Sequence, residues 1–135
     1  MVEREAVAAW LARYIAAWAS YDEAAIGDLF TQDAEYRYHP GDEPVAGRGA
    51  IVRSWVEPGA GADESGRDEP GTYEASYEPF AVDGDRAVAT GWSRYWTDAN
   101  RTVERAVYDN CFVLEFGPDG RCRRFTEWFM QRRTR

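Results

Sequence analysis

The chain has 135 residues, a formal net charge of −8 and an aromatic content of 15%. This length fits one domain with one core, because two domains would each bury too little apolar surface. The acidic charge, without a basic stripe, predicts neither a nucleic-acid partner nor an anionic membrane, since phosphate contacts dominate that kind of affinity.

Residue usage excludes several kinds of site. All sixteen basic residues are Arg, and without Lys neither Schiff-base catalysis nor a Walker-type phosphate loop is available. One His and two Cys outside metal-ligand spacing predict that there is no metal site. The first residues lack a signal-peptide pattern and no apolar run reaches about 18 residues, so we expect no membrane span and a cytoplasmic location.

Three helices are predicted in the first part of the chain. Residues 3–19 place apolar side chains at helical spacing, namely Val7, Trp10, Leu11, Tyr14, Ile15 and Trp18. Core packing is the simpler interpretation of this stripe and a cavity wall is the alternative, since Tyr14 and Trp18 carry polar groups. A second helix is expected over residues 22–30, with Asp22 as its cap, and a third over residues 50–56.

The remaining chain has the pattern of strands and turns. Strands are expected at residues 33–39, 72–82, 86–97, 107–116 and 121–130. Residues 57–71 contain four Gly, two Pro and five acidic residues, which predicts a flexible connector or, alternatively, a lid over a bound ligand. We therefore expect a single domain over residues 1–135 with one flexible loop.

The last two strands predict a hairpin around Gly117-Pro118-Asp119-Gly120. If Gly117 faces Gly120, then Asn110 lies opposite Glu127. The face that carries this pair is otherwise apolar, with Tyr108, Phe112, Leu114, Phe116, Phe125 and Phe129. A polar pair within an aromatic surface indicates a pocket. The same register separates Cys111 and Cys122 by ~13 Å on the opposite face, which predicts free thiols and a reducing compartment.

The preceding turn extends this register. Pairing Asp98 with Arg101 puts Ala89, Gly91, Ser93 and Tyr95 on the face of the Asn110 side chain. The other face then carries Trp92, Arg94, Trp96, Asp109 and Trp128. An aromatic surface that also bears Arg is typical of a subunit interface. A slip of one residue in the turn would exchange the two faces.

Short motifs along nearly the whole chain give it a family resemblance. They are Trp10 to Tyr14 in the first helix, Asp22 to Tyr38 with Leu-Phe-Thr-Gln-Asp-Ala-Glu, Gly47 to Ile51, Tyr108-x-Asn110, and Gly120 to Met130 with Glu127-Trp128-Phe129. In order and spacing the chain resembles the nuclear transport factor 2-like superfamily, and within it the SnoaL-like, polyketide-cyclase-like domains. The resemblance implies an α+β fold, a cone-shaped barrel in which three N-terminal helices pack on a strongly bent antiparallel sheet.

The resemblance also implies a pocket for a small, mostly apolar ligand and a homodimer made through the convex face of the sheet. The fold hosts isomerases, dehydratases, polyketide cyclases, epoxide hydrolases and non-catalytic binders, so it does not choose an activity. Acid/base enzymes of this fold use a carboxylate, or a His with a carboxylate, inside the cone. Three acidic or imidazole groups of this chain are therefore candidates.

Glu127 is the first candidate, because an aromatic surround raises the pKa of a carboxyl toward working pH, and Asn110 would orient it. The alternative is that Glu127 and Asn110 form a buried structural pair. Asp109 is a candidate only if the register slips by one residue; otherwise an ion pair with Arg94 or Arg105 is expected. His39, at a strand end, has an exposed or capping role as its ordinary expectation.

The expected ligand contacts are Tyr14, Trp18, Tyr38, Trp55, Tyr95, Tyr108, Phe112 and Phe125. These residues and Glu127 suit a cofactor-free acid/base enzyme of isomerase, dehydratase or cyclase type, acting on a small apolar compound with a carbonyl or hydroxyl group. Tyr14 or Tyr38 would donate hydrogen bonds. The alternatives are a non-catalytic ligand-binding or dimerisation domain, and protein recognition through the tryptophans of the opposite face.

Overall fold

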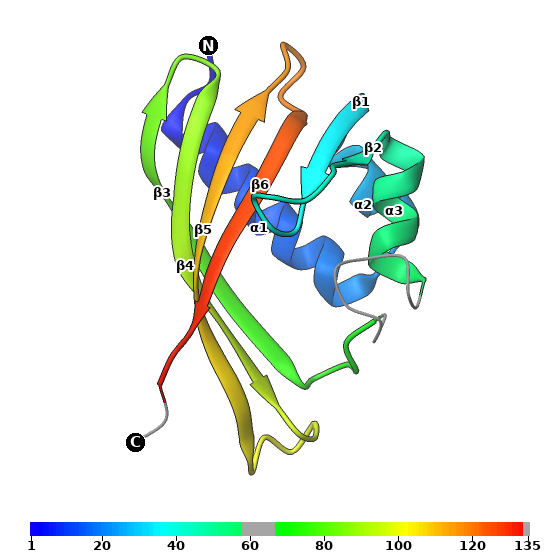
Figure 1. Ribbon diagram of the computed structural model, residues 1–135, viewed down its shortest axis with the longest axis vertical. Coiled ribbons are helices and arrows are strands. Elements are labelled where there is room, and N and C mark those ends of the chain that lie inside the picture. Colours follow the sequence, from blue (N-terminus) through cyan, green and yellow to red (C-terminus); the bar gives the residue numbers. More distant parts are fainter. Residues whose placement is uncertain (58–66, 134–135) are drawn as a thin grey trace.

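The computed structural model describes residues 1–57 and 67–133, which form three helices on one face of a six-stranded sheet (Figure 1). The helices are α1 (Arg4–Ser20), α2 (Glu23–Asp28) and α3 (Arg48–Val56). The strands are β1 (Phe30–Arg37), β2 (Val45–Ala46), β3 (Tyr73–Asp83), β4 (Arg86–Trp96), β5 (Glu104–Phe116) and β6 (Cys122–Gln131), in the sheet order β2-β1-β6-β5-β4-β3. The α+β class and the helix-on-bent-sheet arrangement are confirmed.

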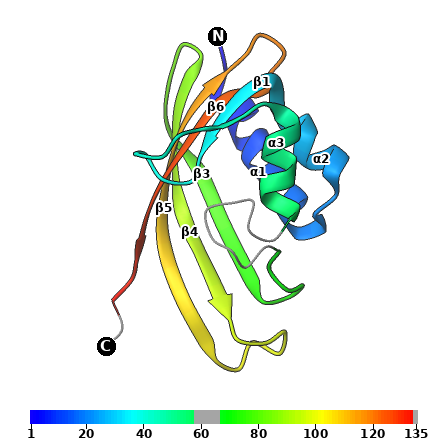
Figure 2. The same cartoon turned by 45° about the vertical axis from the view of Figure 1, so that its right-hand side comes forward.

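The sheet differs from the expected antiparallel barrel in two ways. It is open, with β2 and β3 as its edges, and it is mixed, because β1 pairs parallel with β6. Figure 2 shows the sheet curving around the helices, while the far ends of β3, β4 and β5 extend past them. The helices thus cover one part of the concave face and leave another part of it open.

Most of the apolar stripe predicted for α1 packs into the core, while Ile15 and Trp18 are only partly buried. Val7, Trp10, Leu11, Tyr14 and Ala17 are its buried residues. The helix ends at Tyr21, which adopts a left-handed conformation and donates its amide to the carbonyl of Ala17 at 2.8 Å. The rings of Trp10 and Tyr14 continue into a core that β1, β5 and β6 also supply. Its other large members are Phe30, Tyr36, Phe112, Phe116 and Phe125.

The second helix is capped as expected but is shorter than expected. Asp22 accepts a hydrogen bond from the amide of Ala25 at 2.9 Å, as a capping side chain should. The helix stops at Asp28, and the chain enters β1 at Phe30 rather than at residue 33. The reason is that β1 begins to pair with β6 at Phe30 and Cys122, so residues 30–32 belong to the sheet.

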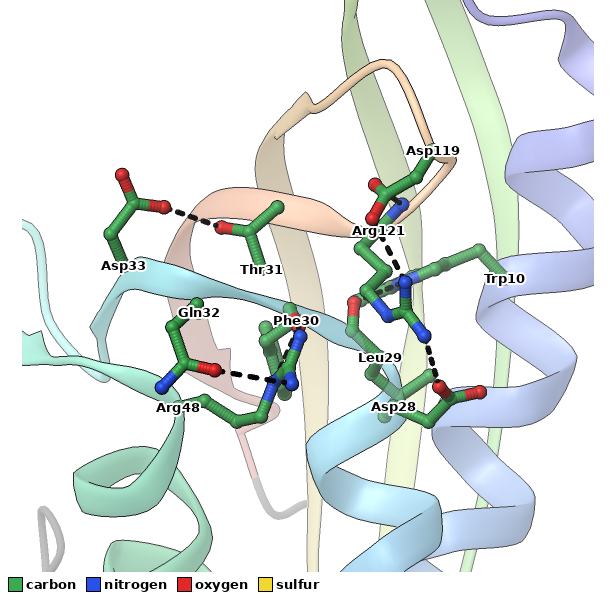
Figure 3. Close-up of polar contacts among 10 residues, drawn as sticks. All are labelled: Trp10, Asp28, Leu29, Phe30, Thr31, Gln32, Asp33, Arg48, Asp119 and Arg121. Carbon is green, nitrogen blue, oxygen red and sulfur yellow. Dashed lines mark hydrogen bonds and ion pairs between the residues drawn. The ribbon is translucent and has the colours of Figure 1, made fainter.

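Polar contacts hold the junction between α2 and β1 (Figure 3). Trp10 donates its indole N–H to the carbonyl of Leu29 at 2.9 Å, and Arg48 donates twice to the carbonyl of Phe30, at 3.0 and 2.8 Å. Leu29 follows the last residue of α2, where intrahelical partners are missing, and Phe30 is the first residue of β1. The junction is therefore satisfied by side chains from α1 and α3.

A second set of contacts ties the β5–β6 turn to α2. Arg121 donates to Asp28 at 2.6 Å and to Asp119 at 2.9 Å, so one guanidinium joins the turn to the helix end (Figure 3). All three side chains are partly or fully exposed, and we therefore assign this contact to orientation more than to stability.

The hairpin register predicted for the last two strands is wrong by two residues. Gly117 pairs with Arg121 instead of Gly120, because Gly120 adopts a left-handed conformation (φ 83°) and lengthens the turn by one residue. An irregularity between the pairs Glu115–Arg124 and Phe116–Cys122 adds a second residue. Each shift of one residue exchanges the two faces of a strand, and a second shift exchanges them back. The predicted faces are therefore correct, although the predicted pairing partners are wrong.

The register between β4 and β5 is wrong in the same way. Arg101 has φ 58°, Thr97 donates its amide to the carbonyl of Val103, and a register shift follows at Tyr95 and Trp96. Gly91 therefore pairs with Asn110, and Ser93 with Tyr108, each two positions from the predicted partner. The faces again remain as predicted.

Cys122 is the exception, because it lies between the two register steps of the hairpin. It was expected on the outer face with Cys111 but is fully buried in the core. Both cysteines are free thiols, as predicted.

The outer face of the sheet carries the predicted aromatic surface. The guanidinium of Arg94 lies 5.5 Å from the ring of Trp92 and 5.9 Å from that of Trp96. Trp128 is 46% exposed and Met130 is 76% exposed. Within the described residues, no helix has the length and apolar character needed to cross a membrane.

Candidate functional site

A cavity of about 370 Å³ lies between the helices and the concave face of the sheet. Seven of the chain's eight tyrosines line it. The lining residues are Tyr14, Trp18, Tyr21, Tyr36, Tyr38, His39, Ser54, Trp55, Asp68, Tyr77, Ser93, Tyr95, Arg105, Tyr108, Asn110, Glu127 and Phe129. Its volume lies at the lower end of the range for small-molecule sites.

Three adjacent strands place a chain of polar side chains on the cavity wall. Ser93 of β4 donates to the amide oxygen of Asn110 on β5 at 3.0 Å, and the Asn110 amide nitrogen donates to Glu127 Oε2 on β6 at 2.8 Å. Asn110 is 7% exposed. Although Asn110 pairs with Phe129 in the ladder, its side chain reaches Glu127 diagonally. The predicted contact between Asn110 and Glu127 therefore forms, but between diagonal positions of the two strands and not between direct ladder partners.

Gly91 allows the strands to approach at this point. It pairs with Asn110 on one side and with Tyr77 on the other. A Cβ atom at Gly91 would collide with the carbonyl oxygen of Ser76 and the ring of Tyr77. The absence of a side chain at Gly91 therefore makes room for the backbone and the Tyr77 ring of β3.

Glu127 is the acidic group of the inner wall. Burial raises the pKa of its carboxyl to about 7, while the hydrogen bond from Asn110 opposes the rise. Among the described residues Glu127 forms no ion pair, and its hydrogen bond uses Oε2. A carboxyl with this pKa exists in both protonation states near neutral pH.

Phenol groups surround this carboxyl. The hydroxyls of Tyr14 and Tyr36 lie 3.0 Å apart and share a hydrogen bond. Burial, and then the charge of Glu127, raise the pKa of Tyr14 and of Tyr77 well above the usual value. Burial and neighbouring phenols do the same for the pKa of Tyr36. These tyrosines stay protonated at neutral pH and act as neutral hydrogen-bond donors.

A second hydroxyl pair lies on the α3 side of the cavity. Ser54 donates to the carbonyl of Ile51 at 2.7 Å, so in the 2.8 Å contact between Tyr38 and Ser54 the phenol is the donor. Trp55 lines the same side, and its ring packs edge-on against Tyr14 at 5.1 Å. This side therefore offers mostly ring surface.

The cavity mouth is built from α1 and the segment before β3. Asp68 accepts hydrogen bonds from the Trp18 indole at 3.1 Å and from the Tyr21 hydroxyl at 3.3 Å. Trp18 also stacks on Tyr73 at 4.4 Å. Most of the loop predicted at 57–71 lies outside the described residues, but Asp68 belongs to that segment and reaches the cavity.

The rim carries the two basic side chains of the site. Arg105 is exposed and its guanidinium lies 5.0 Å from the ring centre of Tyr95. His39 is exposed, contacts Asp42 at 3.2 Å and lies 5.2 Å from the ring of Phe129. His39 is therefore at the edge of the cavity, as a strand-end residue, and not beside Glu127.

Most of the residues predicted from the sequence meet in this cavity. Glu127, Asn110, Tyr14, Trp18, Tyr38, Trp55, Tyr95 and Tyr108 line it. Phe112 and Phe125 do not, because they lie beneath it in the core, where Phe125 stacks on Tyr14 and Tyr36 at 5.6 and 4.3 Å. These two residues support the wall and do not form it.

Asp109 lies outside the cavity. Its side chain is on the outer face of the sheet, where Arg132 donates to both carboxylate oxygens at 3.0 and 2.9 Å. This hydrogen-bonded guanidinium lowers the pKa of Asp109. The expected partners, Arg94 and Arg105, were wrong, because Arg94 pairs with Glu104 and Arg105 faces Tyr95.

Several lining residues were not predicted as site residues. Tyr36 shares a strand face with Tyr38, and Ser93 lies on the face predicted for Asn110, so the alternation in both strands carried a usable signal. The place of Tyr77 depends on the pairing of β3 with β4, whose register shifts between Pro79 and Ala81 before Tyr77 is reached. Asp68 lies in a segment without periodic pattern, and nothing in the sequence placed it at the cavity.

Comparisons with known proteins agree with this fold. A candidate ketosteroid isomerase from Kribbella flavida has a similar structure, with a TM-score of 0.64 and 16% identity over 98% of this chain and 83% of that one. An NTF2-like protein of unknown function from Mesorhizobium loti has a TM-score of 0.61 and 25% identity over 96% of this chain and 95% of the other. No curated protein matches the sequence. The family model of the SnoaL-like domain matches residues 11–125, most of the chain, and the protein therefore belongs to the SnoaL-like domain family.

Proposed function

We propose that the protein is a cofactor-free acid/base enzyme that acts on a small, mostly apolar compound with a carbonyl or hydroxyl group. Glu127 is the proton-transfer group. The observation that carries this proposal is a carboxyl on the wall of an aromatic cavity, held by Asn110 at 2.8 Å, and burial there raises the pKa of this carboxyl to about 7.

The geometry of Glu127 suits proton transfer in both directions. The Asn110 amide occupies Oε2 and orients the carboxyl, and Oε1 makes no hydrogen bond with the described residues. A group whose pKa lies near the working pH has a useful fraction of both forms, and such a group contributes roughly 10²- to 10⁴-fold to rate. Asn110 is then a positioning residue.

The Tyr14–Tyr36 pair is suited to stabilise a negatively charged oxygen. Two phenols that share one hydrogen bond retain one further O–H, which can point to a substrate oxygen. Hydrogen-bond donors that are in position before negative charge develops on the substrate oxygen stabilise the transition state, because they do not have to reorient during the reaction. The charge of Glu127 raises the pKa of both phenols. This supports a single site in which Glu127 transfers the proton and the phenols stabilise the substrate oxygen.

The solved structures support this proposal only through the fold. The Kribbella flavida protein is a candidate ketosteroid isomerase, and proton transfer beside a carbonyl is the chemistry of that activity, but at 16% identity the likeness concerns architecture. The residue-level argument therefore depends on Glu127 and its neighbours in this chain.

A thermal-shift screen tests the proposal. Small aromatic, polycyclic and terpenoid ketones, alcohols and acids are compared on the wild type, Glu127→Gln and Asp109→Asn. We expect a hit that stabilises the wild type and Asp109→Asn but acts differently on Glu127→Gln. Deuterium uptake from D₂O into a ketone hit, followed by NMR, should then depend on Glu127. Hits that bind all three proteins alike and never exchange would refute the proton-transfer role.

That last outcome would favour the alternative, a non-catalytic ligand-binding domain.

We also propose that a second copy of the chain binds to the outer face of the sheet, through Trp128 and the row of Trp92, Arg94 and Trp96. The exposed ring of Trp128 supports this assignment, and Arg94 with Glu104 gives the face both signs of charge, as a self-complementary contact requires.

A further inference from the structure

Aromatic rings make up most of the cavity wall. Ten of its lining residues are Tyr14, Trp18, Tyr21, Tyr36, Tyr38, Trp55, Tyr77, Tyr95, Tyr108 and Phe129. The faces of such rings carry negative potential, and they attract ammonium and guanidinium groups. Two rings of the wall already hold a guanidinium: that of Tyr95 holds Arg105 at 5.0 Å, and that of Tyr21 holds Arg67 at 5.4 Å. The wall therefore offers a surface suited to cations.

The inner wall also carries a carboxyl that is negative when ionised. Glu127 receives one hydrogen bond, from a neutral amide, and no cation among the described residues compensates its charge. An ionised carboxylate in such a place is costly unless a positive group accompanies it. Asp68 adds a second carboxylate at the mouth. A bound cation would stabilise the ionised form of Glu127.

The basic side chains of the site lie at its edge. Arg105 and His39 are both exposed, and His39 contacts Asp42. Neither is in contact with Glu127 through a hydrogen bond or an ion pair in the described structure. The interior is therefore aromatic and acidic, with basic groups confined to the rim.

We propose that the ligand of this cavity is an organic ammonium compound, a body of one or two rings with a protonated amine that pairs with Glu127 among the aromatic rings. This rests on the proposed function, because it takes the same cavity and the same carboxylate as the ligand site, and it adds a protonated amine to the carbonyl or hydroxyl compound proposed there as the substrate. The cavity of about 370 Å³ accommodates such a body with room for its substituents. The amine gives the ligand a charge that a neutral ketone lacks.

Three probes with one ring system separate charge from shape. They are 1-naphthylmethylamine, 1-naphthylmethanol and 1-naphthoate, which are positive, neutral and negative at about pH 7.5. Calorimetric titration of the wild type should show the amine binding about tenfold or more tightly than the alcohol, and the carboxylate binding more weakly than both. In Glu127→Gln the amine should lose this advantage while the alcohol keeps its affinity.

Asp109→Asn is the matched control, because it removes one carboxylate from the outer face and leaves the cavity intact. It should keep the preference for the amine. The inference is overturned if the alcohol or the carboxylate binds as tightly as the amine, if the preference survives in Glu127→Gln, or if none of the three probes binds. A different result would refute the proposed function: neutral ketones from the thermal-shift screen would bind, but their proton exchange would not depend on Glu127.

Discussion

Replacing Glu127 by Gln should change stability in a way that depends strongly on pH. Gln keeps the size of the side chain and an oxygen that can accept the hydrogen bond from Asn110, but it cannot ionise. The folded-state pKa of Glu127, about 7, lies above the ordinary value of 4.5. The folded protein therefore holds the proton more tightly than the unfolded chain does.

The sign follows from this difference. Below about pH 4.5 the carboxyl is protonated in both states and ionisation costs nothing. Between about pH 4.5 and 7 the unfolded chain ionises first, and the folded wild type loses stability; above about pH 7 the loss is complete. At about 1.4 kcal/mol per pKa unit the loss reaches about 3 kcal/mol, an upper value because Glu127 is only half-buried and lines an open cavity.

Urea unfolding of both proteins from about pH 4.5 to 8.5 measures this effect. The free energy of unfolding of Glu127→Gln minus that of the wild type should rise with pH and level off above about pH 7.5. Asp109→Asn provides the control, since the pKa of Asp109 is lowered by Arg132 and its contribution changes only at more acidic pH. A difference between Glu127→Gln and wild type that stays constant over this range would refute the reasoning.

Four further predictions follow from single contacts. Asn110→Ala removes the hydrogen bond that lowers the pKa of Glu127, so NMR titration of that carboxyl should give a midpoint above about 7; an unchanged midpoint would contradict the role of Asn110. Phe125→Ala should cost about 3–5 kcal/mol in chemical denaturation, because the ring is fully buried, and a loss below about 1 kcal/mol would count against the described core. Gly91→Ala should lower Tm markedly, since its Cβ would meet backbone of the neighbouring strand, and an unchanged Tm would show that β3 can move. Trp128→Glu should convert a dimer to monomers in light scattering at unchanged fold, whereas a monomeric wild type would remove the association proposal.

Periodicity and turn residues predicted the elements and the faces of the sheet. Helical spacing identified the buried side of α1 down to Tyr14, and strand alternation put Asn110, Ser93 and Glu127 on one face. Those features are local, because each depends on a few neighbouring residues and on the burial of one side. The Asn110–Glu127 contact followed from them despite the wrong ladder partners.

Strand partners were not predictable in the same way. The β4–β5 and β5–β6 hairpins each gain two residues, one in the turn and one in a nearby irregularity. The sequence marks only the turn residue, through Gly120 in the β5–β6 hairpin and weakly through Arg101 in the β4–β5 hairpin. The parallel pairing of β1 with β6 joins residues about ninety positions apart, and no local pattern specifies it. The burial of Cys122 and the closeness of Tyr36 to Tyr14 both depend on these long-range pairings.

The central claim, that Glu127 is a proton-transfer group of the cavity, is tested most directly by NMR titration of its side-chain carboxyl. The protein would carry ¹³C-labelled glutamate, and the Glu127→Gln spectrum would assign the signal. Our account predicts a midpoint of about 7, set by burial and opposed by Asn110. A midpoint near 4.5, the ordinary value for Glu, would contradict it and leave Glu127 and Asn110 as a structural pair.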